Sequence, residues 1–189
     1  MKKEKESEAI KIEKKYLPEF VYGGIDGSIT TFAVVAGVMG ASLSSAIVLI
    51  LGFANLFADG FSMATSNYLS TKSKIDLISK RNKESSKKLF CVENKKPLKA
   101  SIATFVSFVL IGLIPLVSFL LALIFPELQS YQFRLSIILT ALAFIIVGSL
   151  KAQISHKNIL HSAIETLIIG GIAALVAFSV GHFLRVILN

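Results

Sequence analysis

The sequence predicts an all-α membrane protein with five transmembrane helices, a cytoplasmic N-terminus and a C-terminus on the opposite side. Three observations support this fold class. Of the 189 residues, 53% are hydrophobic and 17% are charged, whereas about a quarter of the residues of a soluble domain are charged. The apolar residues form long blocks. Of the 20 Lys and Arg, 15 lie in residues 2–15 and 72–96, and such flanking clusters are typical of the cytoplasmic side of membrane proteins.

Five apolar blocks are each long enough to cross the hydrocarbon layer, which takes about 20 mostly apolar residues in a helix. Residues 1–19 are expected to be a cytoplasmic segment and not a cleavable signal peptide, because they mix Lys with Glu over too long a stretch. Residues 20–189 then form one transmembrane domain. Its predicted spans are residues 21–42, 45–69, 99–125, 134–154 and 163–188.

The charges of the connections orient these spans. Residues 1–19 hold six Lys, residues 70–97 hold eight Lys and one Arg, and the connection 42–45 has no charge. A cytoplasmic N-terminus agrees with all of these counts. Residues 70–97 are expected to be a basic cytoplasmic loop near anionic headgroups, with helical turns allowed at 72–84. A loop of this length is too short to be a domain.

Several functional classes lack support in the sequence. The single Cys91 cannot form an intramolecular disulfide, and neither a P-loop nor a GxGxxG motif is present. The basic residues flank apolar blocks, so no nucleic-acid partner is expected. No convergent set of nucleophile and base is visible, and Glu165 lacks the His three residues later that a ferritin-like di-iron enzyme needs. The chain is therefore expected to be no enzyme and to hold no tightly bound cofactor.

The first span contains an acid on a face that suits helix packing. Asp26 lies well inside the apolar block, where ionisable residues are costly and usually functional. Thr30 lies beside it on the helix. A stripe of small residues follows on the same face, and such stripes let helices approach closely, so we expect a packing or dimer contact at Ala33, Gly37 and Ala41. The neighbouring glycines are expected to open space near the carboxylate.

The second span carries a polar face around another acid. Asn55, Asp59, Ser62 and Ser66 share one side of a helix with 3.6 residues per turn, and Met63 lies about 40° from Asp59. Carboxylate and amide oxygens suit hard cations, and a thioether shifts the preference toward softer metals such as Fe²⁺. An alternative interpretation of Met63 is a packing residue.

Two further features are secondary candidates. Glu165 lies at the start of the fifth span, near the interface, where it could contribute to a polar path. The same span has a second stripe of small residues at Ala173, Ala177 and Gly181, which could form the dimer contact instead of the first stripe. His156, His161 and His182 are expected to be interfacial.

Several motifs, in order, resemble those of the vacuolar iron transporter family. The resemblance is carried by DGSITTFAVVAGVMGA (26–41), GFANLFADGFSMATSNYLSTKSK (52–74), PLKASIATFVSFVLIGLIPL (97–116) and LKAQISHKNILHSAIETLIIGGIAALVAFSVG (150–181). It covers nearly everything from Tyr16 onward. Several motifs in the same order are much more specific than any one of them.

The resemblance implies a five-helix homodimer that exports Fe²⁺, and often Mn²⁺, from the cytosol in exchange for protons. It implies a pathway at the dimer interface, lined by the first two helices, with Asp26, Asn55, Asp59 and Met63 at matching positions. It also implies a bacterial inner membrane, or a vacuolar or other endomembrane in a eukaryote. Longer members of the family carry a Glu- and Met-rich cytoplasmic insertion after the second helix. Here the corresponding loop has three acids against nine basic residues, and such a loop repels divalent cations.

The chemistry of the two intramembrane acids suggests how such an exchange would work. A carboxyl group held away from water stays neutral unless a cation compensates its charge. Metal ions and protons would therefore compete for Asp26 and Asp59. The alternative function is a non-transporting membrane scaffold or regulatory subunit, whose polar residues only join helices. Interhelical hydrogen bonds in bilayers contribute only about 0.6 kcal/mol on average, which is small against the cost of burying two carboxylates.

Overall fold

A computed structural model describes residues 2–80, 95–155 and 157–188, with side chains from residue 15 onward except at 79 and 80. These residues form α-helices and one short 3-10 turn, and they contain no strand. The prediction of an all-α fold is confirmed. The elements are α1 (Lys2–Gly40), α2 (Ser45–Lys80), α4 (Pro97–Gly112), α5 (Ile114–Ile124), η1 (Pro126–Leu128), α6 (Gln132–Ser155) and α7 (Ile159–Leu188).

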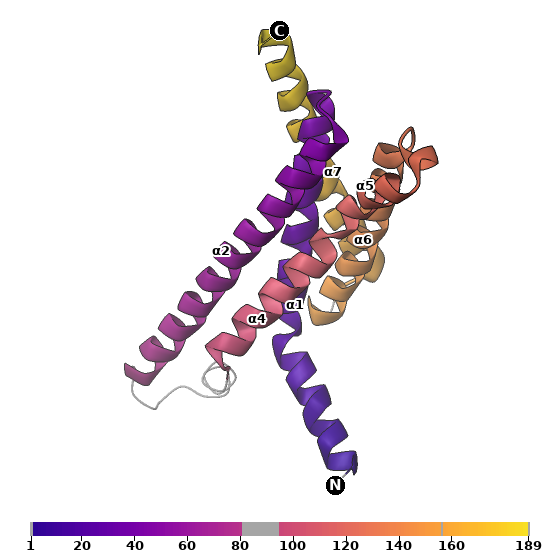
Figure 1. Cartoon of the computed structure of the whole chain (residues 1–189). Helices are drawn as coiled ribbons and strands as arrows, with labels where there is room; N and C mark the ends of the chain where they lie inside the picture. Colours follow the sequence, from indigo (N-terminus) through magenta and orange to yellow (C-terminus); the bar gives the residue numbers. More distant parts are fainter. Residues whose placement is uncertain (1, 81–94, 156, 189) are drawn as a thin grey trace.

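Four helical stretches are long and apolar enough to cross a membrane singly, namely Lys15–Gly40, Ser45–Ile78, Gln132–Ser155 and Ile159–Leu188. The helices α4 and α5 have 16 and 11 residues, so each is shorter than the roughly 20 residues that a crossing needs. Together they pass the same test as a pair bent by 46°. Counting the pair as one span gives five, and α1 begins and α7 ends at opposite ends of the molecule (Figure 1).

The bend between α4 and α5, which lies inside the span predicted over 99–125, has a local cause. Pro115 has no N–H to donate to the carbonyl four residues earlier, and its ring clashes with that carbonyl. Gly112 lies at the break against Leu56, where an added methyl group would collide with that side chain. The Ser136 hydroxyl of α6 donates to the Pro115 carbonyl at 2.7 Å, which ties the broken segment to the neighbouring span.

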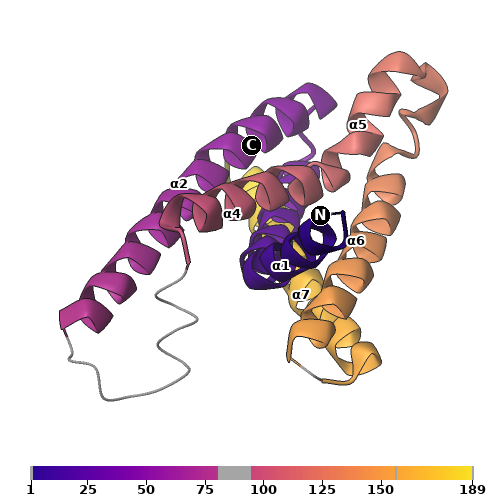
Figure 2. The same cartoon turned by 90° about the horizontal axis from the view of Figure 1, so that it is seen from below.

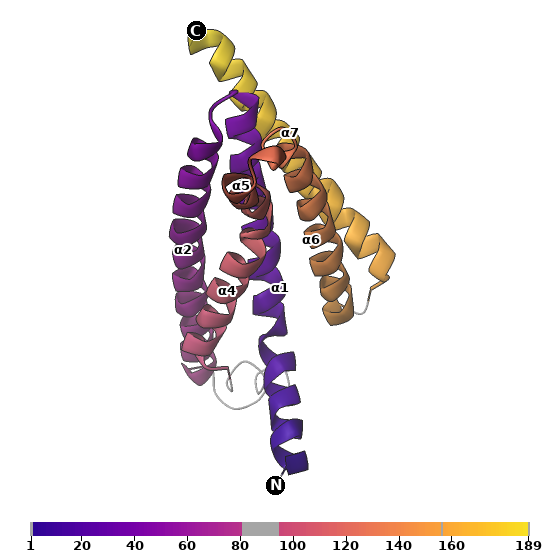
Figure 3. The same ribbon diagram turned by 45° about the vertical axis from the view of Figure 1, so that its right-hand side comes forward.

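The helix α1 lies at the centre of the bundle. Views along and across the bundle place α2 and α4 on one side of it and α6 and α7 on the other (Figures 2 and 3). A hydrophobic core cluster joins α1, α2, α5 and α7 near the turn between the first two helices. Its fully or nearly fully buried members include Val35, Ala36, Val48, Leu116 and Phe119.

The glycines beside Asp26 let α4 pack directly on α1. A methyl group on Gly23 would collide with the Thr104 backbone, and one on Gly27 would collide with the backbone of Phe108. Both glycines are buried. The expected open space next to the carboxylate is therefore filled by α4 at these two positions, and the short side chains serve close helix packing.

The second helix continues well beyond the predicted span end at residue 69. It runs to Lys80, so residues 70–80 of the predicted basic loop are helical. Residues 70–80 contain neither Gly nor Pro, and an apolar run marks the membrane crossing but not the helix end. Residues 81–94 of the predicted loop lie outside the described residues.

Candidate functional site

The helices α1 and α2 form an antiparallel pair joined by a tight turn at residues 41–44. Ser42 adopts a left-handed conformation there, with φ of 55°. Both helices rise about 1.5 Å per residue, so residues equally far from the midpoint of the turn lie at similar levels. By this register Asp26 is level with Asp59, and Tyr22 is level with Met63.

The structure brings the two predicted intramembrane acids together. Asp26 is half-buried on α1 and Asp59 is exposed on α2, and their carboxyl groups are close enough for their charges to interact. Among the described residues, neither carboxyl group forms an ion pair with a Lys or Arg. Two acids of adjacent helices therefore lie near each other, and no Lys or Arg among the described residues compensates their charges.

Asn55 and Thr30, each one helical turn from one of these acids, differ in their hydrogen bonding. The Asn55 side-chain Nδ2 is buried and has no hydrogen-bond partner among the described residues. The Thr30 hydroxyl donates to the Asp26 carbonyl of its own helix at 2.9 Å. Its donor is thus used within α1, and its oxygen can still accept. The Asn55 Nδ2 donor is therefore buried without a partner among the described residues, on a side chain that is otherwise half-buried.

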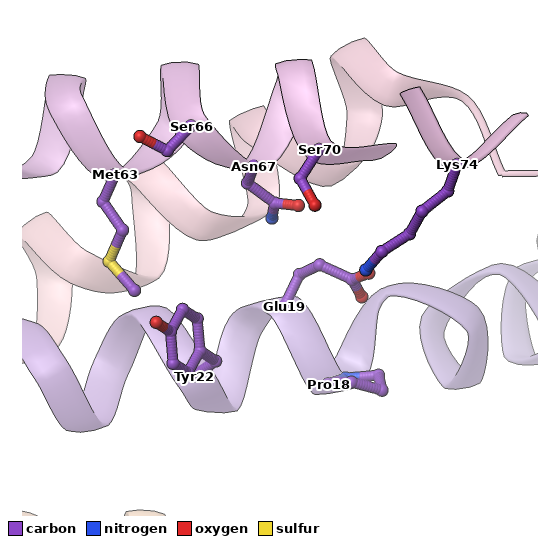
Figure 4. Close-up of a pocket in the computed structure, with 8 residues that line it drawn as sticks. All are labelled: Pro18, Glu19, Tyr22, Met63, Ser66, Asn67, Ser70 and Lys74. Atoms are coloured by element: carbon purple, nitrogen blue, oxygen red, sulfur yellow. The ribbon is translucent and has the colours of Figure 1, made fainter. Parts of the chain in front are cut away.

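A cavity of about 390 Å³ opens between α1 and α2 toward the ends of these helices that lie away from their turn. The Met63 side chain lies opposite the Tyr22 ring across it, and Glu19 lies farther along α1 (Figure 4). The eight residues that line the cavity are Pro18, Glu19, Tyr22, Met63, Ser66, Asn67, Ser70 and Lys74.

Of the predicted site residues, Met63 and Ser66 line this cavity. The sequence analysis missed Glu19 and Ser70, although a helical repeat could have found them. Glu19 precedes Asp26 by seven residues and Ser70 follows Met63 by seven, which is close to two turns and so the same face. Glu19 lies two residues before the predicted span 21–42 and Ser70 one residue after the span 45–69, so both fall just outside the apolar blocks.

Asn67 holds this wall of the cavity against α4. Its Nδ2 donates to the Thr104 hydroxyl at 2.6 Å, and its Oδ1 accepts from the Thr71 hydroxyl at 3.2 Å. The Asn67 side chain is therefore positioned from two sides. It fixes the rotation of α2 in the turn that follows Met63.

The small-residue stripe of α1 is used inside the chain at Gly37. A methyl group there would contact Ala177 of α7, and one on Gly181 would collide with the Gly37 backbone. The two predicted stripes thus pack on each other within one chain at these positions. Ala33 and Ala41 are half-buried. A dimer contact through Ala33, Gly37 and Ala41 stays a prediction.

The secondary candidates lie elsewhere. Glu165 of α7 pairs with Lys151 of α6, with 3.0 Å between its Oε2 and the lysine Nζ, and it does not line the cavity between α1 and α2. His161 and His182 are exposed, and His156 lies outside the described residues. Within the described ranges, no three His, Cys, Asp or Glu side chains gather as a metal cluster.

One face of α2 is left uncovered by the described helices. Asp59, Ser62 and Ser66 are exposed on it. On the opposite side of the same helix, Phe57 and Phe61 are also 54% and 69% exposed. The most apolar stretch of α2 is 28% buried, compared with 56% for the central α1, 33% for α6 and 11% for α7. The polar face that the sequence predicted therefore lies at the surface of a single chain.

Comparison with known proteins gives a family match and several relatives. A family model described as the VIT family matches residues 17–94 and 87–182. The "Vacuolar iron transporter" of Plasmodium berghei (strain Anka) is 26% identical over 96% of this chain and 87% of its own length. "Vacuolar iron transporter homolog 4" of Arabidopsis thaliana is 29% identical over 87% and 81%. "Vacuolar iron transporter 1" of Eucalyptus grandis is 26% identical over 85% and 83%. The apolar helices and these relatives together indicate an integral membrane protein.

Proposed function

Because this chain belongs to the VIT family, as its motifs predicted, we propose that it carries ferrous iron across a membrane, out of the cytosol. The relatives named as vacuolar iron transporters support this function. Within the chain itself, one observation supports this function: Asp26 and Asp59 lie near each other, and neither has a compensating cation among the described residues. Two unpaired acids inside apolar spans favour an ion path over a structural contact.

The acid pair supplies the coupling in this proposal. Two neighbouring carboxylates repel each other unless a proton or a metal ion compensates them. Binding of one cation at Asp26 and Asp59 therefore excludes the other. Protons would move in exchange for metal as the pathway opens to each side in turn.

Three further groups would assist the metal. The Asn55 side chain offers an amide oxygen, and Thr30 an acceptor oxygen, next to the carboxylates. Met63 offers a soft sulfur in the adjoining cavity, which favours Fe²⁺ over harder ions such as Mg²⁺. Mn²⁺ accepts the same oxygen ligands, so we propose it as a second substrate.

We place the N-terminus and the basic residues 72–96 in the cytoplasm, because Lys and Arg accumulate on that side of membranes. The cavity around Glu19 and Met63 then faces the cytosol and receives the metal. The start of α1, the end of α2 and the start of α4 lie toward this side (Figure 1).

A second copy of the chain would complete the site. An exposed Asp59 on an apolar helix is costly against lipid, and each chain by itself supplies only two acids there. A two-fold axis beside α2 would cover its open face and bring four carboxyl groups to one pathway. In a Cys91→Ser background, Ser62→Cys should then form a cross-linked dimer in membranes, whereas Cys at Ile146, exposed on α6, should not. Equal cross-linking at both positions would contradict this axis.

Reconstitution into liposomes tests the function itself. Fe²⁺, Mn²⁺, Co²⁺ and Zn²⁺ are supplied in turn under an imposed pH gradient, and uptake is followed with a trapped metal-sensitive dye. We expect uptake of Fe²⁺ and Mn²⁺ that collapses when the pH gradient is removed. Absence of uptake for every metal would favour the alternative, a scaffold without transport.

A further inference from the structure

Glu19 is the only acid among the residues that line the cavity between α1 and α2. A metal ion that enters this cavity meets its carboxylate before it reaches the acid pair. The Glu19 side chain is only 12% exposed. Its Oε2 is buried and has no hydrogen-bond partner among the described residues, so one carboxylate oxygen remains free for a ligand.

The other oxygen is already occupied by a lysine of the same chain. The Lys95 Nζ lies 2.5 Å from Glu19 Oε1, and the Lys95 side chain is 23% exposed. Lys95 precedes α4, which begins at Pro97, so its backbone is outside any helix. Next to it, the Lys96 backbone N–H donates to the Tyr16 hydroxyl at 3.0 Å. Residues 95–96 therefore form a strap across the middle of α1, attached at Tyr16 and Glu19.

Resting on the proposed function, we propose that Lys95 is a tethered cation that competes with the divalent metal for Glu19 and so sets the metal concentration at which transport half-saturates. An ammonium group in contact with the carboxylate repels an approaching dication. The metal must displace it to use both carboxylate oxygens. Lys74 also lines the cavity and adds to this positive potential.

The competition also discriminates by charge. A divalent ion interacts with a carboxylate about twice as strongly as a monovalent ion at the same distance. The lysine side of the pair is open to solvent screening, so the attraction between the two side chains is weak enough for a dication to displace the lysine. Na⁺ or K⁺, with one charge and no tether, competes poorly with Lys95. The strap thus excludes the abundant monovalent ions from Glu19 while it admits divalent ions.

Lys95→Met tests this inference. Lys96→Met is the matched control, because the Lys96 side chain forms no ion pair or hydrogen bond with the described residues. We expect the half-saturating Mn²⁺ concentration for uptake into proteoliposomes to fall about two- to fivefold in Lys95→Met and to stay unchanged in Lys96→Met. In a Glu19→Gln background, Lys95→Met should have no further effect, because a double-mutant cycle isolates the pair. An unchanged or higher half-saturating concentration in Lys95→Met would overturn the inference.

A second readout separates this role from a purely structural one. Replacing N-methylglucamine by Na⁺ at constant ionic strength should inhibit Mn²⁺ uptake by Lys95→Met and leave the wild type unaffected. Mn²⁺ binding to the purified chain in detergent, measured by electron paramagnetic resonance, should tighten in Lys95→Met by the same factor. This binding measurement stands even if the wild type fails to transport, which would defeat the proposed function alone.

If Lys95→Met does not yield folded protein, Tyr16→Phe provides an independent variant. It removes only the hydroxyl that accepts from Lys96 and so loosens the strap. We expect a half-saturating Mn²⁺ concentration up to about twofold lower. No change in a well-folded Tyr16→Phe variant would contradict the strap as the constraint on Lys95.

Discussion

The molecule contains two antiparallel helix pairs, α1–α2 and α6–α7. They differ in whether their acidic side chains have a lysine partner. Glu165 of α7 is 39% exposed and is neutralised by Lys151 of α6. Asp26 and Asp59 lie at the same level on α1 and α2, and no Lys or Arg in the described part of the chain pairs with either of them. An acid with a lysine partner joins two helices. Two acids without such a partner in apolar spans need a metal ion or protons to compensate their charges.

Replacing one acid of the first pair should have the largest effect on transport. Asp26→Asn or Asp59→Asn removes a charged ligand whose interactions are worth about 1.5–3 kcal/mol, and we expect Fe²⁺ uptake into inside-out vesicles to fall about 10- to 100-fold. Glu165→Gln, the matched variant of the second pair, should change uptake less than about twofold. Equal losses at both pairs would remove the distinction between them.

A second comparison concerns one glycine from each helix pair. Gly27 of α1 lies against the Phe108 backbone of α4, whereas Gly171 of α7 has nothing within 4 Å of an added methyl group. Gly27→Ala should destabilise the protein by about 1–3 kcal/mol through overpacking. Gly171→Ala should be neutral or stabilise it by up to about 1 kcal/mol. Thermal unfolding in detergent measures both, and a neutral Gly27→Ala would contradict the close α1–α4 contact.

Variants of Met63 test whether its sulfur distinguishes Fe²⁺ from Mn²⁺. Met63→Ala removes the thioether from the cavity, and we expect Fe²⁺ uptake to fall about three- to tenfold, with a smaller loss for Mn²⁺, because the harder ion depends less on sulfur. Met63→Leu keeps the volume of the side chain. If Met63→Leu transports Fe²⁺ like the wild type, Met63 serves packing and its proposed role as a ligand is wrong.

The smallest effect on stability and transport is expected from breaking the ion pair between α6 and α7. Lys151→Met breaks the contact with Glu165, and because both side chains are partly exposed and screened by solvent, thermal unfolding in detergent should change only slightly. Metal uptake should remain at the wild-type level. A large loss of uptake in well-folded Lys151→Met would place the second helix pair in the pathway.

The fold could largely be predicted from the sequence because apolar blocks of spanning length dominate it. The acids Asp26 and Asp59 could be found in the same way, since a charge stands out inside such a block. The bend at Pro115 was missed because hydropathy alone does not report a broken backbone. The extension of α2 to Lys80 agrees with the helical turns allowed at 72–84. Hydropathy could not locate its end, because an apolar block ends at the membrane interface while the helix continues.

Contacts that depend on three-dimensional register could not be predicted. The ion pair between Glu19 and Lys95 joins residues 76 positions apart, and nothing in either local pattern indicates the other. The stripes around Gly37 and Gly181 could each be recognised as packing surfaces, but their mutual contact within one chain depends on how α1 and α7 cross. Small residues indicate that a helix is approached closely without identifying the helix that approaches it.

The central claim is that Asp26 and Asp59 carry metal ions and protons in turn, and coupled flux tests it most directly. Proteoliposomes with a trapped pH-sensitive dye are given external Fe²⁺, and luminal pH is followed together with metal uptake. The account predicts that the lumen becomes more alkaline as Fe²⁺ enters through the wild type, and that Asp26→Asn loses both signals together. Iron uptake without any change in luminal pH, or unchanged coupled uptake in Asp26→Asn, would contradict it.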